Sequence, residues 1–320
     1  MAILLPIFAT IFSLHRLLQR RPFSSLAHPI GFMLLLLPVD AGRAEADYTV
    51  QVTRDATYGV GTVRDANGNP ARQPLLVDVY APANCDDTHK PALILVHGGG
   101  FRQGDKGDKN MVNFAQYFAA RGFVCFSINY RMQRDNPPET AAFTGDDRAR
   151  AAAIHAAFVD AKTAVRWVRS NATAFGIDPD RLSALGGSAG AITVLAVAFT
   201  DETRFMSDVP GQTIARENHP GVSSRINACA SCWGSAALFS DAIDKNDPPV
   251  LLFHGQEDKN VNTPPSASEF VSEKCRAAGV PVELHILPGF GHGAWAATVD
   301  GKSLVEVTWD FMQRHLTGRR

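Results

Sequence analysis

Beyond residue 47 the chain alternates short apolar segments with stretches of helical periodicity, and this alternation limits the folds that it can adopt. Segments such as "LLVDVY", "PALILVHGG" and "GFVCFSINY" are rich in residues that strands favour. Between the last two, residues 110–120 place apolar side chains on one face of a helix. Alternating strands and helices predict a mostly parallel sheet with helices on both faces. We therefore expect an α/β fold with about eight strands, in a single domain from residue 47 to residue 320.

The expected strands are 48–53, 75–80, 91–99, 122–130, 181–186, 226–233, 248–255 and 282–289. The turn-rich segment "DANGNP" separates the first two. The expected helices are 110–120, Asp160 to about Phe175, a helix through Val197, and 304–316. Residues 132–159 form the least regular segment.

The first 46 residues have the composition of a targeting segment. Three arginines, the last at Arg21, precede the ten-residue apolar run "IGFMLLLLPV" and then "AEA" at 44–46. This order is typical of a secretory signal that is cleaved at small residues. Neither apolar run of the segment reaches the ~20 residues that span a bilayer. We expect an exported protein, periplasmic or secreted, with no stable membrane span; anchoring through the N-terminus is the alternative.

Charge argues against a nucleic-acid partner. Lysine and arginine total 31 against 32 acidic residues, whereas a protein that binds along phosphates needs a basic excess. The chain also lacks zinc-ligand spacing, and "HGGGFRQGDK" matches neither common phosphate-binding motif. We expect no metal and no organic cofactor. The sequence leaves the oligomeric state open.

The five cysteines are expected to be structural. Cys125 lies in an apolar strand segment and is expected to be a buried thiol. In an exported protein Cys85, Cys229, Cys232 and Cys275 could form disulfides, in a pairing that sequence does not specify. "CASC" resembles a redox motif, but it falls within an expected strand, whereas reactive pairs need a helix N-terminus.

The stretch "LSALGGSAGA" places Ser188 between glycines two positions before and two positions after it. It ends a middle strand and opens an apolar helix, and open α/β sheets carry their sites at that edge. G-x-S-x-G at such a turn is typical of a nucleophile elbow. The motif also arises by chance in roughly one chain in ten of this length, and glycine permits plain tight turns. Partner residues must decide between these interpretations.

A serine nucleophile needs a base, and the base needs an orienting group. Asp258 follows the strand that ends in "LLFHG", and His292 follows the strand that ends in "LPG". Both lie in strand-end loops on the edge that carries Ser188. The order serine, aspartate, histidine is that of α/β-hydrolases. Glu257 is the rival acid, and the spacing H-G-x-x-D favours Asp258.

The segment "LVHGGGF" places Gly98 and Gly99 directly after a strand. One interpretation is a flexible loop. The other is an oxyanion hole, in which glycines let backbone N–H groups approach a developing negative charge. The donors would be the amides of Gly98, Gly99 and Ala189, the residue after the nucleophile. His97 is expected to brace this loop.

These motifs resemble the α/β-hydrolase superfamily, in particular its HGGG-type carboxylesterase and lipase branch. The carrying segments are "LVDVYAP", "HGGGFRQGDK", "INYR", "DAKTAVRWVRSNATAFGIDPDRLSALGGSAGA" and "HGQEDKNV", in that order from about Leu75. Several of these features resemble bacterial carboxylesterases and feruloyl- or acetyl-esterase-like proteins. The resemblance implies an α/β-hydrolase fold, a triad of Ser188, Asp258 and His292, and an oxyanion hole at Gly98, Gly99 and Ala189. Relatives often carry an acid where this chain has Gly187.

The resemblance implies a serine carboxylic-ester hydrolase that works through an acyl-enzyme. Short-chain, aryl-linked or polysaccharide-linked esters are the expected substrates. Four aromatic residues follow strand ends on the active edge and are candidates for substrate contact: Phe101, Trp233, Phe290 and Trp295. Residues 132–159 are expected to form a small cap over the site. The alternatives are a serine peptidase or amidase of the same fold, and a non-catalytic binding protein.

Overall fold

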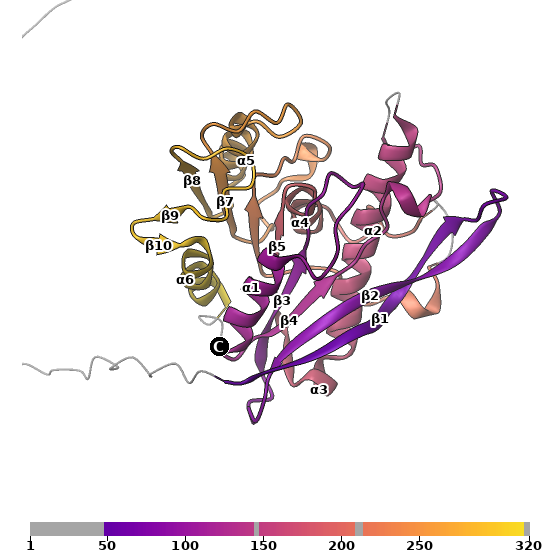
Figure 1. Cartoon of the computed structure of the whole chain (residues 1–320), viewed down its shortest axis with the longest axis horizontal. Coiled ribbons are helices and arrows are strands. Elements are labelled where there is room, and N and C mark those ends of the chain that lie inside the picture. Colours follow the sequence, from indigo (N-terminus) through magenta and orange to yellow (C-terminus); the bar gives the residue numbers. More distant parts are fainter. Residues whose placement is uncertain (1–47, 144–146, 209–213, 317–320) are drawn as a thin grey trace, which may run out of the picture. The chain divides into compact units, whose positions relative to one another are not determined.

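A computed structural model describes residues 48–143, 147–208 and 214–316. The predicted signal segment, residues 1–46, lies outside the described residues. Eight strands form one sheet in the order β1-β2-β4-β3-β5-β6-β7-β8 (Figure 1). Their bounds are β1 Val50–Arg64, β2 Pro70–Pro82, β3 Lys90–Val96, β4 Val124–Ile128, β5 Ile177–Gly187, β6 Ala228–Cys232, β7 Val250–Gly255 and β8 Val282–Leu287. Within this eight-stranded sheet of the described residues, only the pairings β1–β2 and β2–β4 are antiparallel, so the predicted fold class is confirmed.

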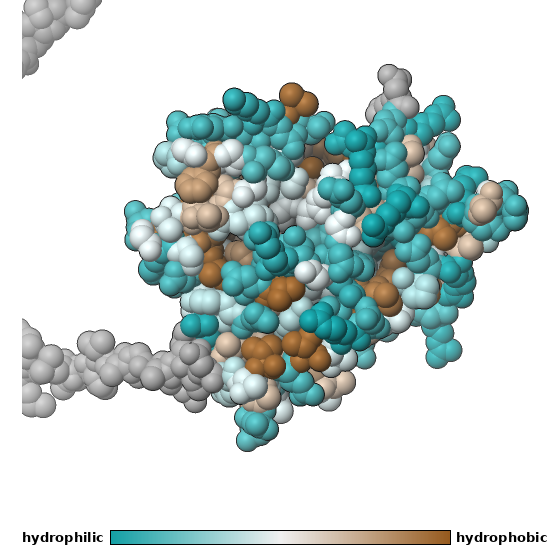
Figure 2. Space-filling model, viewed as in Figure 1, coloured by the Kyte–Doolittle hydropathy of each residue, from teal (hydrophilic) through white to brown (hydrophobic). Residues whose placement is uncertain are grey.

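Helices cover both faces of this sheet, each over its own hydrophobic core. One core includes α2, α4 and α5, and the other includes α1 and α6. The bounds are α1 Lys109–Ala119, α2 Arg148–Ser170, α3 Ala172–Phe175, α4 Ala189–Phe199, α5 Pro265–Ala278 and α6 Leu304–Leu316. Short 3₁₀ helices lie at η1 Gln133–Asp135, η2 Arg216–Asn218 and η3 Ser240–Ala242, and β9 Thr298–Val299 pairs with β10 Lys302–Ser303. In the view of Figure 2 the surface is mostly hydrophilic, with small separate apolar patches.

The first hairpin is longer than the sequence predicts. The prediction ended the first strand at residue 53 and began the second at Leu75, whereas β1 continues to Arg64 and β2 starts at Pro70. Most residues in the added part are exposed or half-buried, so no apolar run marks them as strand. The predicted turn at "DANGNP" is where the hairpin reverses.

The helix predicted from Asp160 begins twelve residues earlier, at Arg148. Asp147 caps it by accepting the backbone N–H of Arg150, and Ala153 and Phe158 are buried in the core. In the alanine-rich first turns the two faces of the helix differ little in hydrophobicity, so the periodicity did not indicate where the helix starts. The predicted cap at 132–159 is therefore divided between a loop with η1 and three turns of α2. Whether that loop covers the site stays a prediction, since residues 144–146 lie outside the described ranges.

Four of the five cysteines lie in strands or a helix, and Cys85 lies in the loop after β2. Within the described ranges all five are free thiols, and all but Cys85 are buried. "CASC" lies in β6 as predicted, and burial raises the pKa of the Cys229 and Cys232 thiols.

Among the described helices, none has the length and apolar character that a membrane crossing requires.

Candidate active site

Ser188 occupies a strained turn between β5 and α4. Its φ of 55° and ψ of −116° lie in a region that residues with side chains rarely adopt. The flanking glycines are required by close packing. A β-carbon at Gly190 would lie 2.0 Å from the Val96 carbonyl oxygen, and one at Gly186 would lie 2.3 Å from the Gly190 carbonyl oxygen. The turn therefore has the geometry of a nucleophile elbow.

Ser188, His292 and Asp258 form one chain of hydrogen bonds. The Ser188 hydroxyl lies 2.8 Å from His292 Nε2, and His292 Nδ1 lies 2.7 Å from Asp258 Oδ2. The Asp258 side chain is fully buried, and that of His292 is 31% exposed. The structure thus brings together the three residues that the sequence singled out, from loops after β5, β7 and β8.

The rival acid, Glu257, is exposed. Its backbone N–H donates to the Phe290 carbonyl, so it joins the acid loop to the histidine loop through the main chain. The sequence gave no role to His254, but its Nε2 lies 3.0 Å from Asp258 Oδ2. The spacing H-G-x-x-D was the only signal that could have found it.

The glycine loop lies directly against the nucleophile. A β-carbon at Gly98 would lie 3.4 Å from Ser188 Cβ. Among the described residues, no acceptor takes a hydrogen bond from the backbone N–H groups of Gly98, Gly99 or Ala189. Free N–H groups beside a serine hydroxyl are suited to bind an oxyanion.

Comparisons with known proteins identify the family of this chain. Residues 77–240, just over half of the chain, match the BD-FAE family. The chain belongs to the BD-FAE family. Residues 233–319 also match the prolyl oligopeptidase family. These matches and the esterase relatives below identify an α/β-hydrolase carboxylesterase, while the HGGG subtype stays a prediction.

Several esterases are similar to this BD-FAE family member. Esterase LipI of Mycobacterium tuberculosis is 25% identical over 69% of this chain and 71% of LipI. Phenmedipham hydrolase of Pseudarthrobacter oxydans is 35% identical over 39% of this chain but only 23% of its own length. The propionate-bound structure of Thermogutta terrifontis Est2 shares the fold, with a TM-score of 0.61 and 22% identity. That match covers 85% of this chain and 95% of the Est2 chain.

His97 braces the glycine loop in this BD-FAE protein, as the sequence predicted. Its ring is buried and stacks on Tyr130, with ring centres 4.5 Å apart. Burial lowers the pKa of His97, which favours a neutral ring, and Nδ1 donates to the Gly98 carbonyl at 2.7 Å. The Tyr130 hydroxyl donates to the His97 carbonyl at 3.1 Å. The loop backbone is thus held on both sides.

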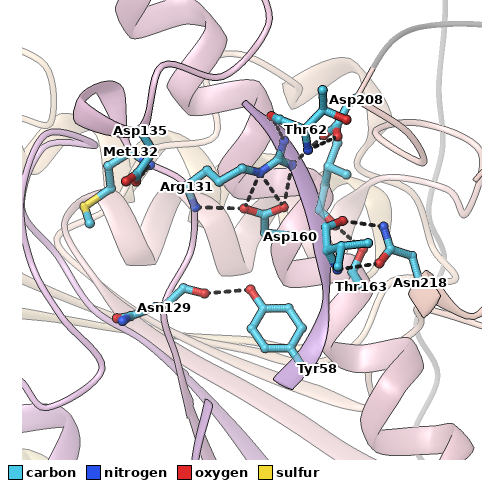
Figure 3. A network of polar contacts seen from close by, with 12 residues as sticks. Tyr58, Thr62, Asn129, Arg131, Met132, Asp135, Asp160, Thr163, Asp208 and Asn218 are labelled. Carbon is cyan, nitrogen blue, oxygen red and sulfur yellow. Dashed lines mark hydrogen bonds and ion pairs between the residues drawn. The ribbon is translucent and has the colours of Figure 1, made fainter. Parts of the chain in front are cut away.

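A buried ion-pair network anchors the segment that carries Tyr130 (Figure 3). The next residue, Arg131, is fully buried and pairs with Asp160 of α2 and with Asp208. Its guanidinium also donates to the Thr62 carbonyl of β1, and its backbone N–H donates to Asp160. The glycine loop is therefore tied, through Tyr130, to β1 and α2. The network was not foreseen, because its members are far apart in sequence.

A cavity of about 390 Å³ lies beside the site. It includes Phe101, directly after the glycine loop, and Ile192, one turn of α4 beyond Ser188. Five other lining residues fall within 132–159, the segment expected to form a cap: Phe143, Asp147, Arg150, Ala151 and Ile154. The remaining four were not predicted: Ser235, Ala237, Leu238 and Asn262. Of the four predicted aromatic contacts, only Phe101 lines this cavity.

The two tryptophans pack against each other instead, with ring centres 4.5 Å apart. Trp233 is buried and lies 6.3 Å from the His292 ring. Trp295 fills the space beside Gly187, where a β-carbon would lie 2.6 Å from the indole. A larger side chain at position 187 would therefore clash with the Trp295 indole. Phe290 is half-buried against the core.

Proposed function

We propose that this carboxylesterase uses Ser188 as nucleophile, His292 as base and Asp258 as orienting acid. The observation that carries the proposal is the continuous hydrogen-bonded chain from the Ser188 hydroxyl through His292 to a buried carboxylate. The strained turn at Ser188 and the free amides beside it support the same assignment.

The reaction follows from these positions. His292 Nε2 takes the hydroxyl proton as Ser188 Oγ attacks the ester carbonyl carbon, and the amides of Gly98, Gly99 and Ala189 bind the oxyanion. His292 then gives its proton to the departing alcohol, which leaves an acyl-enzyme on Ser188. A water molecule then attacks the acyl carbonyl carbon while His292 takes a proton from that water. The carboxylic acid is released as His292 returns the proton to Ser188 Oγ. Asp258 accepts the His292 Nδ1–H throughout.

Short-chain or aryl esters, including those attached to carbohydrate, are the proposed substrates. A cavity of about 390 Å³ with Phe101, Phe143 and Ile192 in its lining has room for an aromatic ring or a short acyl chain. Its apolar residues favour a ring or alkyl group, and its polar residues Ser235 and Asn262 offer hydrogen bonds to an oxygen-bearing group.

Peptide or amide hydrolysis is the second candidate. The match of residues 233–319 to the prolyl oligopeptidase family includes both Asp258 and His292. The same triad would serve either bond, so the leaving group decides between the two functions.

A p-nitrophenyl ester series from acetate to palmitate, with wild type and Ser188→Ala, tests both functions. We expect the wild-type rate to fall as the acyl chain lengthens. We expect Ser188→Ala to lose about 10⁶-fold in kcat. A folded variant that keeps more than a few per cent of the activity would remove Ser188 from the mechanism. Cleavage of p-nitroanilides without cleavage of esters would establish the amidase instead.

A further inference from the structure

Two histidines share the carboxylate of Asp258. Its Oδ2 atom lies 2.7 Å from His292 Nδ1 and 3.0 Å from His254 Nε2. The other oxygen, Oδ1, accepts the backbone N–H of Asn260. The side chains of His254 and Asp258 are both fully buried. The reaction proposed above uses His292 alone and gives His254 no part.

The neighbours of His254 determine where its ring proton lies. Nε2 faces two oxygens, the Asp258 carboxylate and the Thr263 carbonyl, each at 3.0 Å. A carboxylate and a carbonyl only accept, so Nε2 must carry a hydrogen. Nδ1 lies 2.7 Å from the Ser268 hydroxyl, which can donate to it.

The charge of His254 follows from its surroundings. Burial is the largest influence and lowers the pKa of this ring, Asp258 and the Thr263 carbonyl raise it, and the nearby His292 has a smaller lowering effect. The net direction is downward, which favours a neutral ring at pH 7. A neutral ring with its proton on Nε2 satisfies every contact: it donates to Asp258 and Thr263 and accepts from Ser268.

We propose that His254 is a positioning residue that holds the Asp258 carboxylate with Oδ2 facing His292. This inference rests on the proposed function, because it requires Asp258 to orient the base. A neutral donor leaves the carboxylate its full charge, which stabilises the imidazolium that forms as Ser188 attacks. A charged histidine in the same place would offset that charge and weaken the support.

His254 also joins the acid loop to rigid elements. It lies in β7, Ser268 lies in the first turn of α5, and Thr263 is two residues before that helix. One ring therefore links the strand β7, the loop that carries Asp258, and the helix α5. Such a link matters because a displacement of about 1 Å in a catalytic group can cost 10²-fold in rate.

Two substitutions separate donation from simple packing. His254→Phe fills the ring's space without a donor, whereas His254→Gln places an amide N–H near the position of Nε2. For His254→Phe we expect kcat on p-nitrophenyl acetate to fall about 10- to 100-fold, with KM changed less than about 3-fold. We expect His254→Gln to recover most of that loss. If Gln is as slow as Phe or slower, donation is not the role.

The pH profile gives a readout that packing alone would not move. Removal of one donor leaves the Asp258 carboxylate less stabilised, so it holds the protonated base more strongly. The acid limb of the kcat/KM profile should therefore move to higher pH in His254→Phe and return in His254→Gln. An unmoved limb in His254→Phe would contradict the proposal.

A double-mutant cycle tests whether His254 acts through Asp258. In an Asp258→Asn background, His254→Phe should change kcat by less than about 3-fold, since the group it orients is already altered. An equal loss in both backgrounds would show that His254 acts independently and would overturn the proposal.

A measurement on the wild-type protein covers the case in which the His254 variants do not fold. In ring ¹⁵N spectra at pH 7, the histidine whose signals change in Ser268→Ala is assigned to His254, and we expect it to be neutral with its proton on Nε2. A charged ring, or a proton on Nδ1, would overturn the inference. This result does not depend on activity, so it is distinct from a failure of the Ser188→Ala test, which would overturn the proposed function itself.

Discussion

The two sides of Ser188 are built in different ways. On the acid–base side, His292, Asp258 and His254 are side chains carried by β7 and by the loops after β7 and β8, and hydrogen bonds between side chains hold them. On the glycine-loop side, the groups proposed to act are backbone amides. The stacked rings of His97 and Tyr130, together with the Arg131–Asp160 ion pair, hold the loop that carries these amides. We therefore expect substitutions on the acid–base side to lower activity more than stability, and substitutions in the ion pair on the glycine-loop side to lower stability more than activity.

Among the substitutions that compare the two sides, the largest effect should come from Asp258→Asn, on the acid–base side. An amide in this place can hold His292 in the wrong tautomer, and we expect kcat to fall about 10⁴-fold with little change in the free energy of unfolding. Ester hydrolysis and urea unfolding of the same preparation measure the two quantities. Glu257→Gln is the matched control, because Glu257 is adjacent but exposed, and it should keep wild-type activity. A large loss in that control would transfer the acid's role to Glu257.

The next effect should appear as stability, on the glycine-loop side. Asp160→Asn leaves the buried Arg131 guanidinium short of a counter-charge, and we expect the free energy of unfolding to fall by about 3–5 kcal/mol. The exposed pair Arg72–Glu217 serves as control, since solvent screens it and Glu217→Gln should leave the free energy of unfolding close to that of wild type. Urea titration measures both. If Asp160→Asn keeps the wild-type free energy of unfolding but its kcat falls about 10⁴-fold, the contrast between the two sides is wrong.

Gly187→Ala tests the place where the two sides meet. The new methyl group would lie 2.6 Å from Trp295, three residues after His292. Overpacking of this kind costs about 1–3 kcal/mol, and displacement of the indole should also lower kcat. Adding Trp295→Phe should restore part of both losses by making room. Thermal unfolding and ester kinetics measure the two recoveries. Equal stability of the double and single variants would mean that contact with the Trp295 indole is not the cause of the lost stability.

The smallest effect concerns pH and His155 of α2. Burial lowers the pKa of this histidine to about 4. Below pH 6.5 the His155 ring of the unfolded chain therefore becomes protonated, whereas that of the folded chain stays neutral until about pH 4. Stability therefore falls as the pH is lowered through this range. Between pH 7 and pH 5 we expect His155 to account for about 1–2 kcal/mol of lost stability. His155→Phe, beside Phe143 and Phe205, should abolish that share of the pH dependence. An unchanged slope in urea unfolding would show that His155 does not cause it.

Much of the site was readable before the structure. The order of Ser188, Asp258 and His292, each after a strand, was sufficient to predict that they would meet, because parallel strands end at one edge of the sheet. The substrate contacts were not readable in the same way. Phe101 lines the cavity, but Trp233 and Trp295 turned out to pack against each other, since an aromatic residue after a strand can face either a cavity or a neighbouring ring.

The sequence by itself determined the α/β sheet, the elbow around Ser188 and the chain order of the triad, because these depend on local periodicity and spacing. Tertiary structure alone decided the second donor on Asp258, the ion pair behind the glycine loop, the indole over Gly187 and the early start of α2. Each of these depends on distances between segments that are remote in the chain, or on burial that composition does not reveal. Periodicity specifies which face of an element is apolar, but only packing specifies which atoms meet there.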